Sequence, residues 1–134
     1  MARVEYVLYG NFDDIVAHVT QGVLDGSLSA SLEDGSDIRV GRTRCALRVF
    51  ERYSMMEKGP VSLSVVMVGG EEGVHLSAIP AGGDQGLLGG ATIGEKRFLD
   101  TLPPVVEAWQ SQHSRPPAPP SEPRQPPVWW SNSE

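Results

Sequence analysis

Side chains alternate between apolar and polar along residues 43–54, which marks this segment as a long β-strand. Its odd-numbered row is mostly apolar and comprises Cys45, Leu47, Val49 and Tyr53. Its even-numbered row carries three arginines with two apolar residues between them: Arg44, Ala46, Arg48, Phe50 and Arg52. A period of two, with one apolar and one charged row, is typical of an antiparallel strand that covers a core. We therefore expect this strand to be central and its odd-numbered row to be buried.

The same alternation predicts three further strands, over residues 2–9, 61–67 and 74–79. Residues 27–41 have the pattern of a short hairpin, with Asp34-Gly35-Ser36 as its turn. Six glycines in residues 80–94 leave room for a short last strand at most.

Two segments space their apolar residues at helical intervals. The first follows Asn11, a favourable N-cap, and Gly22 weakens its C-terminal end. Its apolar stripe comprises Phe12, Ile15, Val16, Val19 and Val23. The second covers residues 95–110, where Pro103-Pro104 predicts a kink or two short helices in the same phase. We expect both stripes, including Trp109, to be buried against the sheet.

The order of these elements predicts an α+β fold. Local hairpins and two amphipathic helices pack economically as a curved antiparallel sheet of five to six strands with both helices on one face, in the order β-α-β-β-β-β-β-α. This arrangement resembles a reduced form of the helix-grip architecture, in which a sheet wraps a long C-terminal helix. The resemblance rests on element order alone, so it implies a fold and no activity. We expect residues 1–110 to form a single domain and residues 111–134 to form a separate tail.

The tail carries seven of the eleven prolines and is otherwise mostly polar. We expect it to be disordered or polyproline II and to contribute little to folding stability. Its P-x-x-P frames, flanked by Arg115 and Arg124, suit a reader of proline motifs, and a plain linker has the same composition. Trp129-Trp130 can dock onto the domain or enter a partner's pocket, and we expect both to be exposed in the isolated protein.

The charge of the chain argues against nucleic-acid and membrane partners. The formal net charge is -6, and the tail is neutral, so the whole acidic excess lies on the domain. Contacts to phosphate need a basic surface instead. The single cysteine excludes an intrachain disulfide, and neither a signal peptide nor a transmembrane stretch is visible. We therefore expect a soluble cytoplasmic protein.

Four blocks of the chain form a recognisable pattern: SASLEDGSDIRVG (29–41), CALRVFERYSMM (45–56), VSLSVVMVG (61–69) and LSAIPAGG (76–83). With these blocks the chain resembles a small bacterial family of uncharacterised proteins, a domain of unknown function, over residues 2–102. The S-A-S-L-E-D and E-R-Y-S blocks are the most specific. The resemblance implies no activity and no catalytic or binding residue, and the double proline and the tail are departures from it.

The arginine row is the first candidate site. Arg44, Arg48 and Arg52 suit a carboxylate or phosphate ligand, because the planar guanidinium donates paired hydrogen bonds to such oxyanions. A solvated sheet face explains the same row if its arginines pair across strands with nearby acidic residues: Glu5, Glu33 or Asp37.

A second candidate is a polar site around Glu51, Tyr53 and His75, because a carboxylate beside a histidine is suited to acid–base chemistry. His75 has the opposite parity from the apolar row of its own strand, however, which favours an exposed histidine. The third candidate is a mobile lid that contacts a ligand through Gly82, Gly83, Asp84 and Gln85. A plain flexible loop is its alternative, since no phosphate-binding glycine motif is present.

Other chemistry is not indicated. Cys45 lies mid-strand in an apolar row and reads as a small buried hydrophobe. His18, His75 and His113 are scattered without metal-ligand spacing. We expect no metal, no cofactor and no catalytic residue.

Three functions from different classes remain open. The lack of a catalytic constellation favours a non-catalytic module that binds a small apolar ligand between sheet and helices, or a protein partner on the arginine row. An enzyme requires Glu51, Tyr53 and His75 to converge in one cleft. An oligomerisation scaffold would pair the edge of the first strand, or of the hairpin strand, with a second copy.

Overall fold

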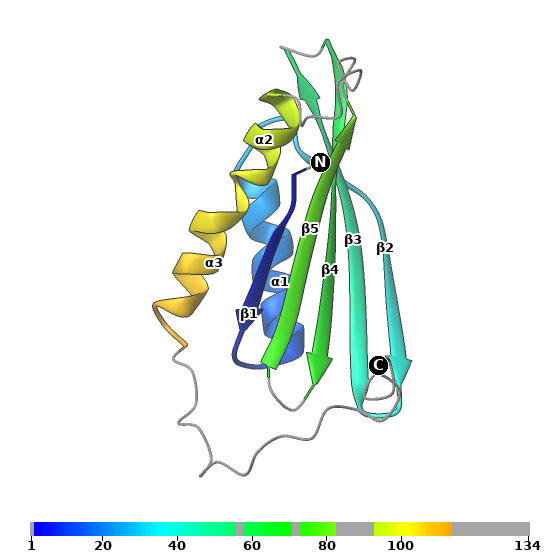
Figure 1. Cartoon of the computed structure of the whole chain (residues 1–134), viewed down its shortest axis with the longest axis vertical. Helices are drawn as coiled ribbons and strands as arrows, with labels where there is room; N and C mark the ends of the chain where they lie inside the picture. Colours follow the sequence, from blue (N-terminus) through cyan, green and yellow to red (C-terminus); the bar gives the residue numbers. More distant parts are fainter. Residues whose placement is uncertain (1, 56–57, 71–72, 83–92, 114–134) are drawn as a thin grey trace, which may run out of the picture.

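The computed structural model describes residues 2–55, 58–70, 73–82 and 93–113, which form one antiparallel sheet with helices on one face (Figure 1). The strands are β1 (Val4–Leu8), β2 (Ser31–Val40), β3 (Thr43–Ser54), β4 (Gly59–Gly70) and β5 (Gly73–Gly82). The helices are α1 (Phe12–Asp25), α2 (Ile93–Leu99) and α3 (Leu102–Gln110). The predicted α+β fold is confirmed with five strands. The expectations for a last strand before residue 93 and for a disordered tail concern segments outside the described residues.

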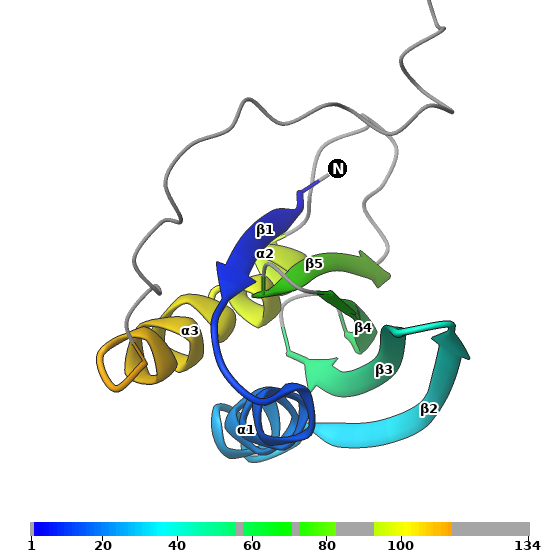
Figure 2. The same cartoon turned by 90° about the horizontal axis from the view of Figure 1, so that it is seen from below.

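The strands lie in the order β1-β5-β4-β3-β2, and every neighbouring pair is antiparallel. Helix α1 carries the chain from β1 at one edge to β2 at the other, and short connections then lead back strand by strand to β5 beside β1. Viewed from below, the sheet curves, and the three helices lie on its inner side (Figure 2). No described helix covers the outer face of the sheet.

The row of β3 that packs against the helices is the even-numbered one, so the sequence prediction for this strand is wrong. Ala46 and Phe50 are fully buried, whereas Leu47 is 38% and Tyr53 is 54% exposed. Both rows of this strand contain apolar residues, and a period of two does not say which row meets the helices. The neighbouring strand decides the matter, because Phe50 lies opposite the buried Leu63 of β4.

The hairpin predicted at Asp34-Gly35-Ser36 is also wrong. These residues lie within β2, which pairs with β3 along its length and has a register shift between Leu32 and Asp34. A β-bulge of this kind absorbs a turn-like sequence without reversing the chain. The reversal falls at Gly41, which has a φ of 58° and follows the last residue of β2.

The helices begin and end largely as predicted. The Asn11 side chain accepts a hydrogen bond of 3.0 Å from the Asp14 backbone N–H and caps α1. The predicted interruption at Pro103-Pro104 is confirmed as two helices, with the prolines in the first turn of α3, where no helical hydrogen bond is lost. Trp109 is buried, as predicted, and its indole N–H donates to the Tyr9 carbonyl oxygen at 2.8 Å.

The core lies between the inner face of the sheet and the helices. Its largest fully buried side chains are Phe50, Phe98, Leu8, Ile15, Leu63, Met67, Leu76 and Leu102. These side chains fill the layer between sheet and helices, where the sequence analysis predicted that a small apolar ligand could bind.

Gly22 has a packing role that the sequence did not reveal. It is the point where α1 meets α3, since a Cβ added there would lie 2.6 Å from Val105 Cγ1 and 2.7 Å from Val105 Cγ2. The lack of a side chain at this position therefore allows the two helices to approach.

We expect Gly22→Ala to lower the melting temperature, although alanine favours an isolated helix by about 1 kcal/mol. The added methyl group must push α1 and α3 apart, and overpacking of this kind costs about 1–3 kcal/mol. Thermal unfolding followed by circular dichroism measures the change. Gly70→Ala is the matched control, because its added Cβ meets nothing within 4 Å. A Gly22→Ala protein at least as stable as the wild type would contradict this close approach.

Candidate functional site

The arginine row of β3 points toward the helices, and α1 divides its members between two grooves. Arg44 and Arg48 line a groove of about 450 Å³ between α1 and the β2–β3 pair. Arg52 lines a groove of about 590 Å³ between α1 and the α2–α3 segment. The three arginines that the sequence grouped together therefore do not form one site.

Arg44 and Arg48 are each paired with an aspartate. Arg44 Nη1 and Nη2 donate to the two carboxylate oxygens of Asp13 at 2.9 and 2.7 Å. Arg48 Nη2 donates to Asp37 Oδ1 at 3.1 Å, and Asp37 was among the predicted partners. The hydrogen bonds from Arg44 lower the pKa of the Asp13 carboxyl group below its ordinary value. For these two arginines, the explanation by pairing with acidic residues is sufficient.

Arg52 is in a different position. Its guanidinium lies over the Phe98 ring, 5.0 Å from the ring centroid, and Arg97 of α2 lines the same groove. Burial, and after it the positive charge of Arg97, lower the pKa of Arg52. Among the described residues, no aspartate or glutamate forms an ion pair with either Arg52 or Arg97.

The other polar groups of this groove are held by their neighbours. The His18 ring hydrogen-bonds through Nε2 to the Val105 carbonyl oxygen at 2.8 Å. Thr101 Oγ1 donates to the Phe98 carbonyl oxygen at 2.7 Å. The remaining lining residues are Gly22, Asp25, Gly26, Asp100, Pro104 and Ala108. Within the described part of the groove, the two guanidinium groups are therefore the charged donors that a ligand can meet.

Glu51, Tyr53 and His75 lie on the outer face of the sheet, but they do not converge. The sheet register places His75 in one cross-strand row with Val68 and Cys45. Glu51 is six residues farther along β3 than Cys45, a distance of roughly 20 Å at about 3.3 Å per residue. His75 is exposed, as its parity predicted. Glu51 was expected in a buried row, whereas its row is the outer one.

Glu33, on the adjacent strand β2, changes the pKa of Glu51. A hydrogen bond with Glu33, followed by burial and the Glu33 charge, raises the pKa of Glu51. A carboxyl group with a raised pKa favours its protonated form in the folded state. The pair therefore opposes folding at neutral pH, and this effect disappears as the pH falls below the pKa of an unfolded glutamate. Two repelling carboxylates at the sheet rim, far from His75, do not make an acid–base site.

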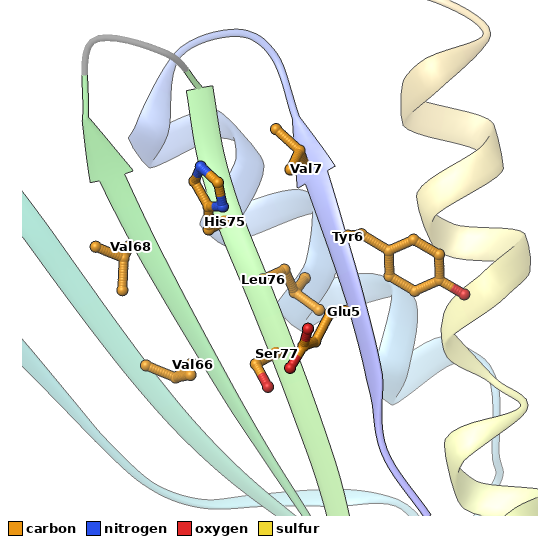
Figure 3. Close-up of a pocket in the computed structure, with 8 residues that line it drawn as sticks. All are labelled: Glu5, Tyr6, Val7, Val66, Val68, His75, Leu76 and Ser77. Atoms are coloured by element: carbon orange, nitrogen blue, oxygen red, sulfur yellow. The ribbon is translucent and has the colours of Figure 1, made fainter. Parts of the chain in front are cut away.

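A shallow depression of about 380 Å³ lies on the outer face over β5 (Figure 3). Its outer-face lining comprises Glu5 and Val7 from β1, Val66 and Val68 from β4, and His75 and Ser77 from β5. Figure 3 also shows the Tyr6 ring turned away, toward the helix side. Cys45, expected to be buried, is half-buried on this face opposite Val68. Of the six outer-face residues that line the depression, three are valines and three are polar.

The predicted glycine-loop site is described only at its start. Gly82 ends β5 with a φ of 111°, and a Cβ there would lie 2.8 Å from the Pro60 carbonyl oxygen. That close approach explains the glycine without a ligand. Gly83, Asp84 and Gln85 lie outside the described residues, and their contact with a ligand stays a prediction.

Two further kinds of site were searched for in the described part of the chain. No group of three or more His, Cys, Asp or Glu side chains there is arranged to hold a metal ion. None of the described helices is both long and apolar enough to cross a membrane.

The architecture and the arginine groove define a small α+β protein with an open antiparallel sheet. A family model described as "Family of unknown function (DUF6054)" matches residues 1–110, and the chain belongs to this family. The resemblance to a domain of unknown function is thereby confirmed. A comparison with curated proteins found no match.

Sequence reasoning singled out Arg52 but missed Arg97 and the groove. Arg97 stands beside Lys96 in the segment 95–110, where two neighbouring cations normally indicate a solvated helix face. Phe98 could have indicated the groove, because it directly follows Arg97 in the sequence. Its apolar ring packs onto the sheet and brings the start of this segment close to Arg52.

Proposed function

We propose that this protein is a non-catalytic ligand-binding module that holds a small oxyanion, a carboxylate or phosphate group, between Arg52 and Arg97. One observation carries the proposal: both arginines line the same groove, and neither has an acidic partner among the described residues. The proposed site is the groove between α1 and the α2–α3 segment.

Electrostatics supports a ligand at this position. The two positive charges at this groove repel each other, and the partial burial of Arg52 adds to the cost of keeping that guanidinium charged. A bound oxyanion reverses the sign of this interaction and accepts paired N–H donors from the guanidinium groups.

The rest of the arginine row provides an internal contrast. Arg44 and Arg48 stand on the same strand at the same spacing, and each is neutralised by an aspartate of the protein. Two aspartates line the groove of Arg52, and neither forms an ion pair with it. A ligand that supplies the negative charge explains why this one member of the row differs.

Asp25 and Asp100 also line the groove, so its charged residues sum to no net charge. Long-range attraction of anions is therefore weak here. Recognition would depend on direct hydrogen bonds to Arg52 and Arg97, which favours a small, planar or tetrahedral oxyanion over a polyanionic surface.

Inorganic phosphate or acetate is expected to raise the melting temperature of the full-length protein. At ten times the dissociation constant, a ligand that binds only the folded state adds about 1.4 kcal/mol. A stabilisation of that size raises the melting temperature of a domain of about 100 residues by several degrees. Sodium chloride at matched ionic strength provides the baseline, since screening alone changes stability. Comparing phosphate with acetate identifies the preferred oxyanion.

Substitutions locate the effect. Arg52→Met and Arg97→Gln are each expected to abolish the shift, and Arg48→Gln, in the other groove, is expected to retain it. Without added anion, Arg52→Met should melt above the wild type, because it removes the repulsion and keeps an apolar stem over Phe98. Arg48→Gln should melt below the wild type, because it leaves Asp37 without its partner. A phosphate or acetate shift of equal size in the Arg52→Met protein would refute the site.

A further inference from the structure

We infer that two copies of this chain associate through their outer sheet faces, about a two-fold axis that runs along β4. This inference is independent of the arginine groove, which lies on the other face. Its basis is the juxtaposition, in one cross-strand row, of the exposed Leu47 on one side of β4 and a depression on the other.

The outer face is not covered by any described element, and it presents many apolar side chains among serines and charged residues. Its exposed or half-buried apolar side chains come from all five strands: Val7, Ile38, Cys45, Leu47, Val49, Val66, Val68 and Ile79. A sheet normally buries each apolar face against a second layer. Contiguous apolar patches left on a protein surface mark interaction sites.

The sheet register shows how a second copy would fit. Leu47 lies opposite Val66, Val66 opposite Ser77, and Ser77 opposite Glu5. Val66 on β4 is therefore flanked by the Leu47 side chain on β3 and by the depression over Ser77 on β5 (Figure 3).

A rotation by 180° about an axis along β4 exchanges the two sides of this row. It places Leu47 of each copy over Ser77 of the other, and Val66 against its own counterpart. Leu47 and the depression over Ser77 lie one strand from the axis, on opposite sides of it. The two symmetric contacts between Leu47 and this depression therefore form at once. Such self-complementarity is what an isologous interface requires.

The neighbouring cross-strand row has an aspartate at one end and an arginine at the other, and the same two-fold axis would pair these opposite charges. Asp34 on β2 shares this row with Ile79 on β5. Arg3 immediately precedes β1 and extends the row past Ile79, because Val4 lies opposite Ala78. The two-fold rotation brings Arg3 of one copy toward Asp34 of the other. Both charges lie at the edge strands, outside the central contact, and Arg3 also lies 3.7 Å from Glu5 of its own chain. Their attraction therefore favours this alignment only weakly.

The sheet edge is a less suitable interface than the face. The free edge of β2 has a bulge next to Glu33, and Asp34 and Asp37 add negative charge. Bulges and charges at an edge strand oppose pairing with another chain. Among the alternatives that the sequence left open, pairing through the β2 edge is therefore less favourable than contact between faces.

The curvature of the sheet limits the size of this contact (Figure 2). The outer face bends away from the axis on both sides, so the contact is concentrated on β3, β4 and β5. Three strands of about ten residues present roughly 500 Å² per copy. A standard interface buries about 800 Å² per partner. We therefore expect a dissociation constant in the micromolar range or weaker.

Size-exclusion chromatography with light scattering tests this on the full-length chain, from about 10 to about 500 μM as this affinity class requires. The mass is expected to rise with concentration from 14.5 kDa toward twice that value. Leu47→Glu is expected to raise the dissociation constant at least about 100-fold, because it places a charge in the apolar contact. Leu28→Glu is the matched control, since Leu28 is fully exposed before β2 and away from the face.

Charge reversal tests the two-fold geometry. Arg3→Asp and Asp34→Arg should each raise the dissociation constant by about fivefold, as expected for exposed pairs. The double variant should return to the wild-type value.

The inference is overturned by a monomer at every concentration, by equal effects of Leu47→Glu and Leu28→Glu, or by a double reversal no better than the single ones. A monomer whose outer-face amide signals change when the chain is truncated after His113 would assign the face to the tail. That outcome also excludes the second copy as its occupant.

Discussion

Phe50→Ala is expected to lower the free energy of unfolding by about 3–5 kcal/mol, the range for removing a buried aromatic ring. Phe50 is fully buried on the inner face of β3, opposite Leu63, and its loss leaves a cavity beneath the helices. Tyr53→Ala, three residues farther along the same strand, is expected to cost less than about 1 kcal/mol, because exposed side chains contribute little. Urea unfolding followed by circular dichroism measures both values.

The comparison tests which row of β3 faces the core. If the odd-numbered row were the buried one, Tyr53→Ala would be the more damaging change. That result would exchange the inner and outer faces of the sheet. It would also remove the groove site of Arg52 and the apolar face offered for self-association.

Trp109→Ala is expected to have a similar effect, about 3–5 kcal/mol. The indole ties the end of α3 to the β1–α1 connection: its N–H donates to the Tyr9 carbonyl oxygen, and His113 stacks on it with ring centroids 3.7 Å apart. Gly10 accommodates the ring, since a Cβ there would lie 2.8 Å from it. Far-UV circular dichroism is the suitable probe, because the change removes a fluorophore.

Trp109→Phe separates packing from hydrogen bonding. Phenylalanine retains much of the apolar contact and loses the bond to Tyr9, so we expect a cost of about 1 kcal/mol. If Trp109→Ala proved no worse than Trp109→Phe, α3 would not depend on this side chain for its position.

Elements whose pattern has one interpretation were predicted well from the sequence. In β4 and β5 one row is apolar throughout, with members such as Leu63, Val65 and Leu76, whereas the other row mixes apolar residues with serines and a histidine. The row that is apolar throughout is the buried one. The start of α1 was also predicted, because a capping asparagine acts on backbone groups three residues away. Local interactions of this kind do not depend on the rest of the fold.

The errors fall where the chain offers two interpretations. β3 has apolar residues in both rows, and Asp34-Gly35-Ser36 suits a turn as well as a bulge. The choice between them was made by neighbouring strands: β4 presents Leu63 and Val65 on its inner row, and the length of β3 keeps β2 paired through the bulge.

The candidate site depended on tertiary structure even more strongly. Arg52 and Arg97 are 45 positions apart in the sequence, and neither stands in a motif. They share a groove because Phe98 packs beneath the Arg52 guanidinium where α2 crosses the sheet. The outer-face row of Leu47, Val66 and Ser77 likewise exists only once the strands are in register.

The sequence by itself determined the α+β class, the amphipathic helix stripes, the antiparallel character of the sheet and the acidic balance of the domain. These follow from local periodicity, capping and composition, which are properties of short segments or of sums. Only the tertiary structure decided which face of β3 is buried, which of the described arginines have acidic partners and which sheet face no described helix covers. Those features depend on contacts between residues distant in the chain, and such contacts arise from the packing of the helices on one side of the sheet.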